Sequence, residues 1–146
     1  MPVSRNWQNQ YIEIKFFIMK KKISSGSPWE DVVGYSRAVR VGNIIEVSGT
    51  TAMDGTKLVG RGDLYAQTRF ILKKIEKALL ETEATLEDIV RTRMYDTDIK
   101  HWEEAGRAHG EIFKKIKPVS TMVEVSRLIN DDLLIEIEAT AILETN

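Results

Sequence analysis

The sequence predicts a single α+β domain in which two helices cover one face of a sheet of five or six strands. The 146 residues suffice for one domain and leave no room for two. Two segments carry apolar residues at helical spacing, whereas the other ordered segments have an extended pattern. Their order, strand–strand–helix–strand–helix–strand–strand, is typical of helices packed on one face of a sheet.

The N-terminal part is predicted to contain a strand and then a hairpin. Residues 11–18 alternate, with four apolar side chains on one side, which predicts a strand. Residues 24–28 (Ser-Ser-Gly-Ser-Pro) interrupt regular structure. Residues 37–51 are extended again, and a turn at 42–43 (Gly-Asn) predicts a hairpin whose second strand is 44–48.

The two helices are predicted to begin at Asp63 and near Asp98. The stripe that buries the first consists of Leu64, Thr68, Ile71, Leu72, Ile75, Ala78 and Leu79. The stripe of the second consists of Trp102, Ala105, His109, Ile112 and Ile116, and Pro118 ends it. Between them, a capped turn at 85–88 leads into a strand at 89–95. Two last strands, about 120–128 and 133–142, follow the second helix.

Composition excludes several classes of function. The net charge of −1 argues against the generally basic surface of nucleic-acid-binding proteins, and the short lysine runs at 20–22 and 114–115 are expected to be solvated. With no cysteine, thiol catalysis and zinc–thiolate sites are excluded. His101 and His109 lie too far apart to chelate one ion, so we expect neither metal nor cofactor. No apolar run reaches the ~20 residues of a membrane span, and a cytoplasmic protein is expected.

Three groups of polar residues could carry chemistry. Glu136 and Glu138 share a strand face and could form an acid/base dyad, but cross-strand pairing with Arg91 and Arg93 is the commoner arrangement and is favoured. His109 could be a base, although a half-buried, hydrogen-bonded ring is favoured. The loop at 60–63 lacks the Gly-Lys-Ser/Thr of a phosphate loop and carries an aspartate where phosphate would bind.

A series of short motifs occurs in order over residues 34–141. They are Gly34-Tyr35-Ser36 with Ala38-Val39, Val47-Ser48-Gly49, Gly62-Asp63 with Ala66-Gln67-Thr68-Arg69, Asp88-Ile89-Val90 with Met94-Tyr95, Pro118, Val123-Glu124-Val125 with Arg127-Leu128, and Ile135-Glu136-Ile137-Glu138-Ala139. In their order and spacing these motifs resemble the RidA family of the YjgF-type Rid superfamily. The resemblance covers about three-quarters of the chain. Residues 1–18 have no counterpart, so we divide the chain into an N-terminal extension with an added strand (1–23) and a RidA-like domain (24–146).

The resemblance implies a homotrimer of chorismate-mutase-like subunits with clefts between neighbours. A physical argument points the same way, because two helices leave one sheet face without cover. The last two predicted strands also carry apolar residues on both of their faces. Val123 and Val125 point to the side opposite Met122, and Ile135 and Ile137 point to the side opposite Leu134. We therefore predict that identical subunits bury the second face.

Deaminating members of the resembled family hydrolyse enamines or imines to a 2-keto acid and ammonia. The resemblance implies that Glu136 positions the attacking water, that Tyr35 closes the cleft and that Ser48 lines it. Ser120 stands where deaminating members carry a carboxylate-binding arginine, Gly106 where they often carry asparagine, and Met122 where they have a small residue or cysteine. A serine hydroxyl cannot neutralise a carboxylate.

Two interpretations of function therefore remain open. The first is a small-metabolite cleft with hydrolase or deaminase-like chemistry on a non-standard substrate. The alternative is a non-enzymatic interaction or regulatory trimer, and a translation inhibitor with endoribonuclease-like activity is a weaker third option.

Overall fold

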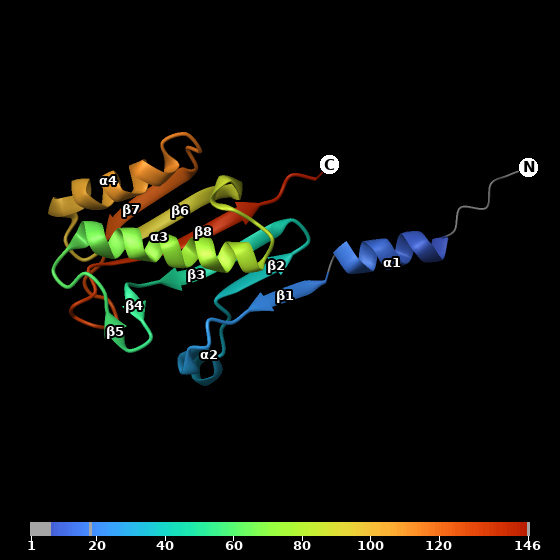
Figure 1. The fold of residues 1–146 in the computed structure, drawn as a ribbon, viewed down its shortest axis with the longest axis horizontal. Helices are drawn as coiled ribbons and strands as arrows, with labels where there is room; N and C mark the ends of the chain where they lie inside the picture. Colours follow the sequence, from blue (N-terminus) through green and yellow to red (C-terminus); the bar gives the residue numbers. More distant parts are fainter. Residues whose placement is uncertain (1–6, 18, 146) are drawn as a thin grey trace, which may run out of the picture.

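A six-stranded mixed sheet with two long helices on one face forms the body of the protein (Figure 1). The computed structural model describes residues 7–17 and 19–145. The strand order is β1-β2-β3-β8-β6-β7, in which only β6 and β7 pair in parallel. These strands are β1 (Lys20–Ile23), β2 (Ala38–Val41), β3 (Ile44–Thr50), β6 (Ile89–Asp96), β7 (Val119–Glu124) and β8 (Ile135–Ile142), and β4 (Met53–Asp54) pairs separately with β5 (Lys57–Leu58). The helices are α1 (Trp7–Phe17), α2 (Pro28–Val33), α3 (Leu64–Glu81) and α4 (Trp102–Phe113).

The predicted α+β class and the central elements are confirmed. The hairpin β2–β3 turns at residues 42–43, and β6 follows a capping box between Thr85 and Asp88. Asp63 caps α3 by accepting a hydrogen bond from the backbone N–H of Ala66. Every residue predicted for the buried stripe of α3 is buried. Helical periodicity is informative here because the apolar stripe begins directly after an N-cap residue, Asp63.

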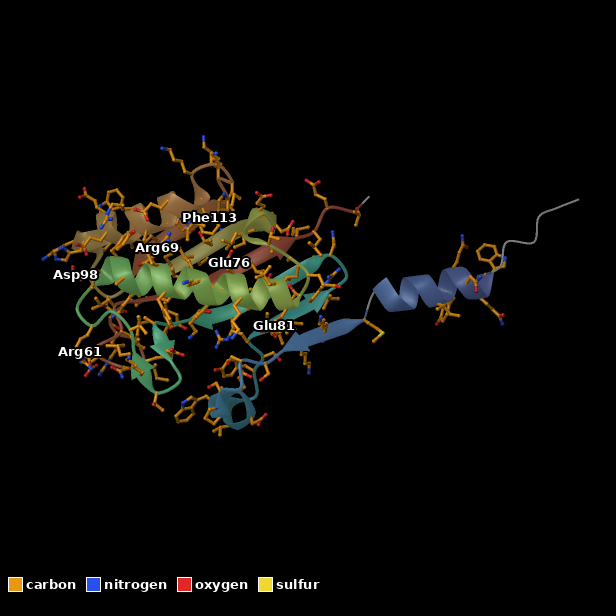
Figure 2. All side chains as sticks on the ribbon, viewed as in Figure 1. Arg61, Arg69, Glu76, Glu81, Asp98 and Phe113 are labelled. Atoms are coloured by element: carbon orange, nitrogen blue, oxygen red, sulfur yellow. The ribbon has the colours of Figure 1, made fainter. Side chains whose placement is uncertain are left out.

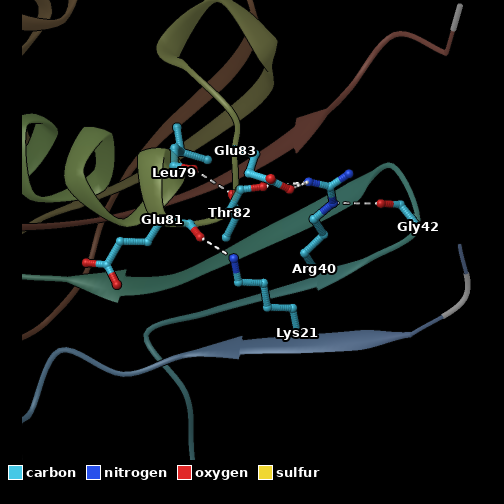
Figure 3. Close-up of polar contacts among 7 residues, drawn as sticks. All are labelled: Lys21, Arg40, Gly42, Leu79, Glu81, Thr82 and Glu83. Carbon is cyan, nitrogen blue, oxygen red and sulfur yellow. Dashed lines mark hydrogen bonds and ion pairs between the residues drawn. The ribbon is translucent and has the colours of Figure 1, made fainter. Parts of the chain in front are cut away.

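Cations from the first two strands bind the C-terminal end of α3 (Figure 3). Lys21 Nζ donates to the Glu81 carbonyl oxygen at 2.8 Å, and Arg40 Nη1 donates to that of Thr82 at 2.7 Å. Arg40 also pairs with the Glu83 carboxylate at 2.9 Å. The last carbonyls of a helix lack intrahelical partners and carry partial negative charge, so these contacts fix α3 on the sheet.

The strand predicted at residues 11–18 is wrong, because residues up to 17 belong to the helix α1. This helix extends away from the sheet in Figure 1. A strand without a neighbouring strand would leave its backbone N–H and C=O groups unpaired, whereas a helix pairs them internally. The strand within the first 23 residues is β1, at Lys20–Ile23, which pairs with β2.

The second helix also differs from its prediction. Trp102 is 51% exposed rather than buried, and its ring lies over Gly106, where a Cβ would meet it at 3.4 Å. The helix α4 ends at Phe113 instead of continuing to Pro118. Lys117 has a φ of +52°, a left-handed conformation that cannot continue the helix.

The face of the sheet opposite α3 and α4 is more polar than the sequence suggested. On β8 this face presents Glu136, Glu138 and Thr140. The alternate residues of the strand are buried and face the helices; they are Ile135, Ile137, Ala139 and Ala141. Leu134, which precedes β8, is partly buried and packs against the hydrophobic core. The prediction of an apolar second face is wrong for β8; exposed valines on β7, Val119 and Val123, supply apolar surface.

Candidate active site

A β-bulge brings Glu136 against Gly49. The register between β3 and β8 shifts between Val47 and Thr50, so Ser48 and Gly49 lie in the irregular part of the strand. A Cβ atom built on Gly49 would lie 2.1 Å from Glu136 Oε1. Only glycine leaves room for the carboxylate in this position, so the bulge fixes where the acid lies.

The Glu136 carboxyl has an environment suited to proton transfer. Burial raises its pKa above the usual range, the charge of Glu138 raises the pKa further, and Arg37 partly offsets both. Within the part of the chain that the structure describes, Glu136 makes no hydrogen bond, whereas Glu138 accepts one from Tyr95 Oη at 3.0 Å. Glu136 is therefore available to bind a water or a ligand.

Glu138 forms the predicted cross-strand ion pair. Arg93 and Glu138 are register partners on β6 and β8, and Arg93 Nη1 lies 3.4 Å from Glu138 Oε1. The two glutamates therefore have different partners, which argues against a symmetrical carboxylate dyad. Arg91 pairs with Thr140 in register, so it does not face Glu136.

Arg37 joins the cluster and was missed in the sequence. Its Nη1 donates to the Gly49 carbonyl oxygen and to Thr50 Oγ1, both at 3.0 Å. Tyr35 lies with its ring centroid 5.8 Å from the guanidinium carbon, and Ser48 Oγ donates to the Arg37 carbonyl at 3.2 Å. The predicted turn at 42–43 implies that residue 37 faces residue 48, so the hairpin register contained the signal.

In the structure, Arg37 contacts both Tyr35 and Ser48, and Gly49, which follows Ser48, lies against Glu136, whereas the other predicted site residues lie elsewhere in the subunit. Ser120 lies on the helix-covered side of the sheet, where its Oγ accepts a hydrogen bond from Thr92 Oγ1 at 2.9 Å. Met122 is the register partner of Met94, which is buried. Gly106 lies on α4 beside the Trp102 ring. A site containing all six predicted residues would need a second subunit.

His109 is half-buried and hydrogen-bonded, as favoured from the sequence. Its Nε2 lies 2.9 Å from Thr92 Oγ1, and its ring centroid lies 4.5 Å from that of Phe113. Burial lowers the pKa of His109, which keeps the ring neutral. His109, Thr92 and Ser120 thus form a continuous polar chain from α4 to β7.

Replacing Thr92 by valine should reduce the free energy of unfolding by about 1–2 kcal/mol, because the fully buried hydroxyl links two polar partners. Urea denaturation measures the change. The control Thr140→Val removes a hydroxyl that bonds the exposed Glu46 and should change stability by less than about 0.5 kcal/mol. Equal effects of the two substitutions would contradict a structural role for the chain of hydrogen bonds.

The raised pKa of Glu136 predicts a pH-dependent stability penalty. The folded state holds this proton more tightly than the unfolded state, so stability falls as pH rises through the folded-state pKa. Glu136→Gln cannot ionise and should escape this loss. Thermal melts from about pH 4 to about pH 7 should show the variant gaining stability relative to the native protein as pH rises. Parallel curves would contradict the prediction.

The loop before α3 does not form an anion site. Arg61, at the loop end of α3 in Figure 2, pairs with the Asp132 carboxylate, and Asp63 occupies the helix N-terminus.

Over residues 7–17 and 19–145, no group of three His, Asp or Glu side chains is arranged to hold a metal ion. No helix in this part of the chain is long and apolar enough to span a membrane.

Comparison with known proteins identifies the family. A family model described as Endoribonuclease L-PSP matches residues 27–143. The structure of Rv2704 from Mycobacterium tuberculosis, a member of the YjgF/YER057c/UK114 family, is 50% identical, with a TM-score of 0.79 over 86% of this chain and all of that one. The chain belongs to this family.

Three further proteins are similar over most of this chain. The uncharacterized protein SCO2049 of Streptomyces coelicolor is 36% identical over 83% of this chain and 90% of its own length. The 3-aminoacrylate deaminase RutC of Acinetobacter baylyi is 31% identical over 73% and 85%, respectively. The E. coli YjgF structure is 26% identical, with a TM-score of 0.74 over 85% of this chain and 99% of that one.

Proposed function

We propose that the protein hydrolyses a small enamine or imine at the cluster of Tyr35, Ser48 and Glu136. The observation that carries the proposal is the half-buried Glu136 carboxylate, held against Gly49 without a hydrogen bond from the described residues. A base with a raised pKa in a cleft is suited to activate water. The relative from A. baylyi, named as a 3-aminoacrylate deaminase, supports the same reaction class.

In the proposed reaction, an enamine first takes a proton from solvent on carbon and becomes an iminium ion, or an imine is protonated on nitrogen to the same ion. Glu136 accepts a proton from a water molecule as the water oxygen attacks the iminium carbon, which gives a neutral carbinolamine. Glu136 then returns this proton to the nitrogen, and the C–N bond breaks as the hydroxyl oxygen forms the carbonyl and its proton returns to solvent, which releases ammonia and leaves a ketone. Tyr35 limits access of bulk water and Ser48 lines the same cleft. No redox partner is required for these steps.

The substrate is proposed to differ from the standard 2-imino acids, because the resemblance implies that Ser120 stands where deaminating members carry a carboxylate-binding arginine. Loss of a bidentate charged pair costs about 2–5 kcal/mol in an enclosed site. A coupled assay with 2-aminoacrylate generated in situ tests this point. We expect a rate well below that of an arginine-bearing relative, and an equal rate would contradict the proposed specificity.

The alternative function is a non-enzymatic interaction or regulatory trimer. The exposed Val119 and Val123 on the edge strand β7 favour it, because exposed apolar side chains on an edge strand suit a protein contact. Endoribonuclease-like activity is the weaker option and draws support from the description of the family model. RNA binding with a steep salt dependence would support that option, and lack of RNA binding would remove it.

We further propose that the protein is a homotrimer whose subunits complete the small-molecule cleft between them. YjgF-family proteins generally form trimers, and one subunit separates Glu136 from Ser120 across its own sheet. Light scattering at micromolar concentration should give about three times the 16.7 kDa of one chain. A clean monomer would contradict any site that needs residues from two subunits.

A further inference from the structure

Three hydrogen-bonded side chains connect the surface of β7 with α4. Ser120 is exposed on the edge strand β7, and its Oγ lies 2.9 Å from Thr92 Oγ1. Thr92 is fully buried on β6, and its Oγ1 lies 2.9 Å from His109 Nε2. This polar chain therefore runs from an exposed hydroxyl, through a buried hydroxyl, to a half-buried imidazole.

The polar chain can carry a proton from Ser120 to His109. A hydroxyl both donates and accepts hydrogen bonds, and a neutral imidazole has one donor and one acceptor nitrogen. When Nε2 of His109 carries the proton, Thr92 donates to Ser120. When the proton is on Nδ1, Nε2 accepts from Thr92, and Thr92 accepts from Ser120. Burial lowers the pKa of His109, so the ring is neutral and can accept a proton at neutral pH.

An aromatic surface lies on the same face of α4 as the imidazole. Trp102, Gly106 and His109 are spaced by four and three residues, which places them on one face of a helix. The Trp102 ring packs over Gly106, where a Cβ would meet it at 3.4 Å. Half of the Trp102 side chain is exposed, so it offers apolar surface to a molecule bound near His109.

We propose that Ser120 is a nucleophile that cleaves small apolar esters, with Thr92 and His109 as the relay that takes its proton. An activated serine needs a base within hydrogen-bond reach or one bridging group away, and the polar chain supplies both the bridge and the base. In the described part of the sheet, β7 pairs only with β6, so backbone N–H groups on its outer edge are available to the carbonyl oxygen of the ester. This proposal does not rest on enamine hydrolysis at Glu136.

In the proposed reaction, Ser120 Oγ forms a bond to the ester carbonyl carbon. The Ser120 proton passes to Thr92 Oγ1 as the Thr92 proton passes to His109 Nε2. The tetrahedral intermediate then breaks its bond to the alcohol oxygen, which takes the proton back from His109 through Thr92. Water attacks the resulting acyl-serine, gives a proton to His109 by the same route, and releases the acid as Ser120 Oγ leaves and regains its proton. The sum is ester plus water giving acid plus alcohol.

Within the part of the chain that the structure describes, His109 has no carboxylate to orient its ring, since its hydrogen bond is to Thr92. The reaction should therefore be slow on ordinary esters and is best detected with reactive probes. We expect an alkyl fluorophosphonate to form a P–O bond to Ser120 with loss of fluoride, and p-nitrophenyl butyrate to be hydrolysed. Intact-protein mass and peptide mapping identify the labelled residue, and release of p-nitrophenolate gives the rate.

Variants separate this chemistry from non-specific labelling. Ser120→Ala should abolish labelling, and His109→Gln should slow it about 100-fold or more, the usual contribution of a base. The control Thr121→Ala removes an exposed hydroxyl from the next residue of β7 and should leave labelling unchanged. The labelling rate of the native protein should rise with pH through a midpoint below 6.5, as His109 loses its proton, and His109→Gln should lack this step.

Thr92 is tested by a pair of substitutions. Thr92→Val removes the bridging hydroxyl and should slow labelling about as much as His109→Gln. Thr92→Ser keeps the hydroxyl and should retain most of the rate, which distinguishes proton transfer from packing.

A native protein that does not react, a label on another residue, or native labelling in Ser120→Ala would overturn the proposal. Equal rates in Thr92→Val and Thr92→Ser would overturn the relay. Labelling at Ser120 in a protein that hydrolyses no enamine would uphold this site and refute the activity proposed for Glu136. Enamine hydrolysis without labelling would do the reverse.

Discussion

Replacing Glu136 by glutamine is expected to lower the rate of enamine or imine hydrolysis about 10²- to 10⁴-fold, the usual contribution of a positioned general base. Glutamine has nearly the same shape and fits against Gly49, but its amide cannot accept the proton of the attacking water. The decrease should appear in kcat more than in KM, because the lost interaction forms chiefly in the transition state. The coupled assay, run on whichever enamine the native protein hydrolyses, measures both constants.

A matched control is available on the same face of the sheet. Glu46 on β3 is exposed and accepts a hydrogen bond from Thr140 Oγ1 at 2.8 Å. Glu46→Gln removes the same charge from the chain and should leave hydrolysis unchanged. A native rate in Glu136→Gln, or an equal loss in both variants, would show that Glu136 is not the base.

The loss of activity should accompany a gain in stability at neutral pH, since Glu136 carries the desolvation cost described above. A functional group is commonly kept in an environment that is unfavourable for folding. The opposite signs of the two changes distinguish loss of a functional carboxylate from general damage to the fold, which would lower both activity and stability.

The elements predicted correctly from the sequence are those in which a local signal, such as a helix cap or a turn, agrees with the pattern of buried residues. The helix α3 has its cap at Asp63 and a continuous buried stripe, and the β2–β3 turn at 42–43 sets a register that the structure confirms. The same register places Arg37 opposite Ser48, as the structure also confirms. At these positions, interactions between residues that are close in the sequence determine the local structure.

The remaining features depend on contacts that periodicity does not encode. The alternation at residues 11–18 is compatible with a strand, but residues 11–17 belong to α1, residue 18 lies outside the described residues, and no strand of the described part of the chain pairs with this segment. The side of the sheet occupied by Ser120 follows from its parallel register with Thr92, which a sequence pattern cannot supply. The hydrogen bonds of Arg37 to Gly49 and Thr50 depend likewise on the bulge in β3, which a sequence pattern cannot place.

Gly49→Ala should reduce hydrolysis about 100-fold with little loss of stability. The added Cβ would lie 2.1 Å from Glu136 Oε1 but 3.1 Å from its Cδ, so the clash falls on the end of a flexible side chain. The carboxylate can relieve the clash by rotating away, and a displacement of about 1 Å is enough to cost roughly 10² in rate.

The control for Gly49→Ala is Gly110→Ala on α4, where a Cβ would meet nothing within 4 Å. That substitution should leave hydrolysis unchanged and raise stability by about 0.5–1 kcal/mol, because alanine favours the helix. The assay and urea denaturation together check both variants. If Gly49→Ala unfolds the protein, the bulge rather than the carboxylate absorbs the clash. If it retains native activity, the contact with Gly49 does not position Glu136, since the carboxylate must then be able to work from a different place.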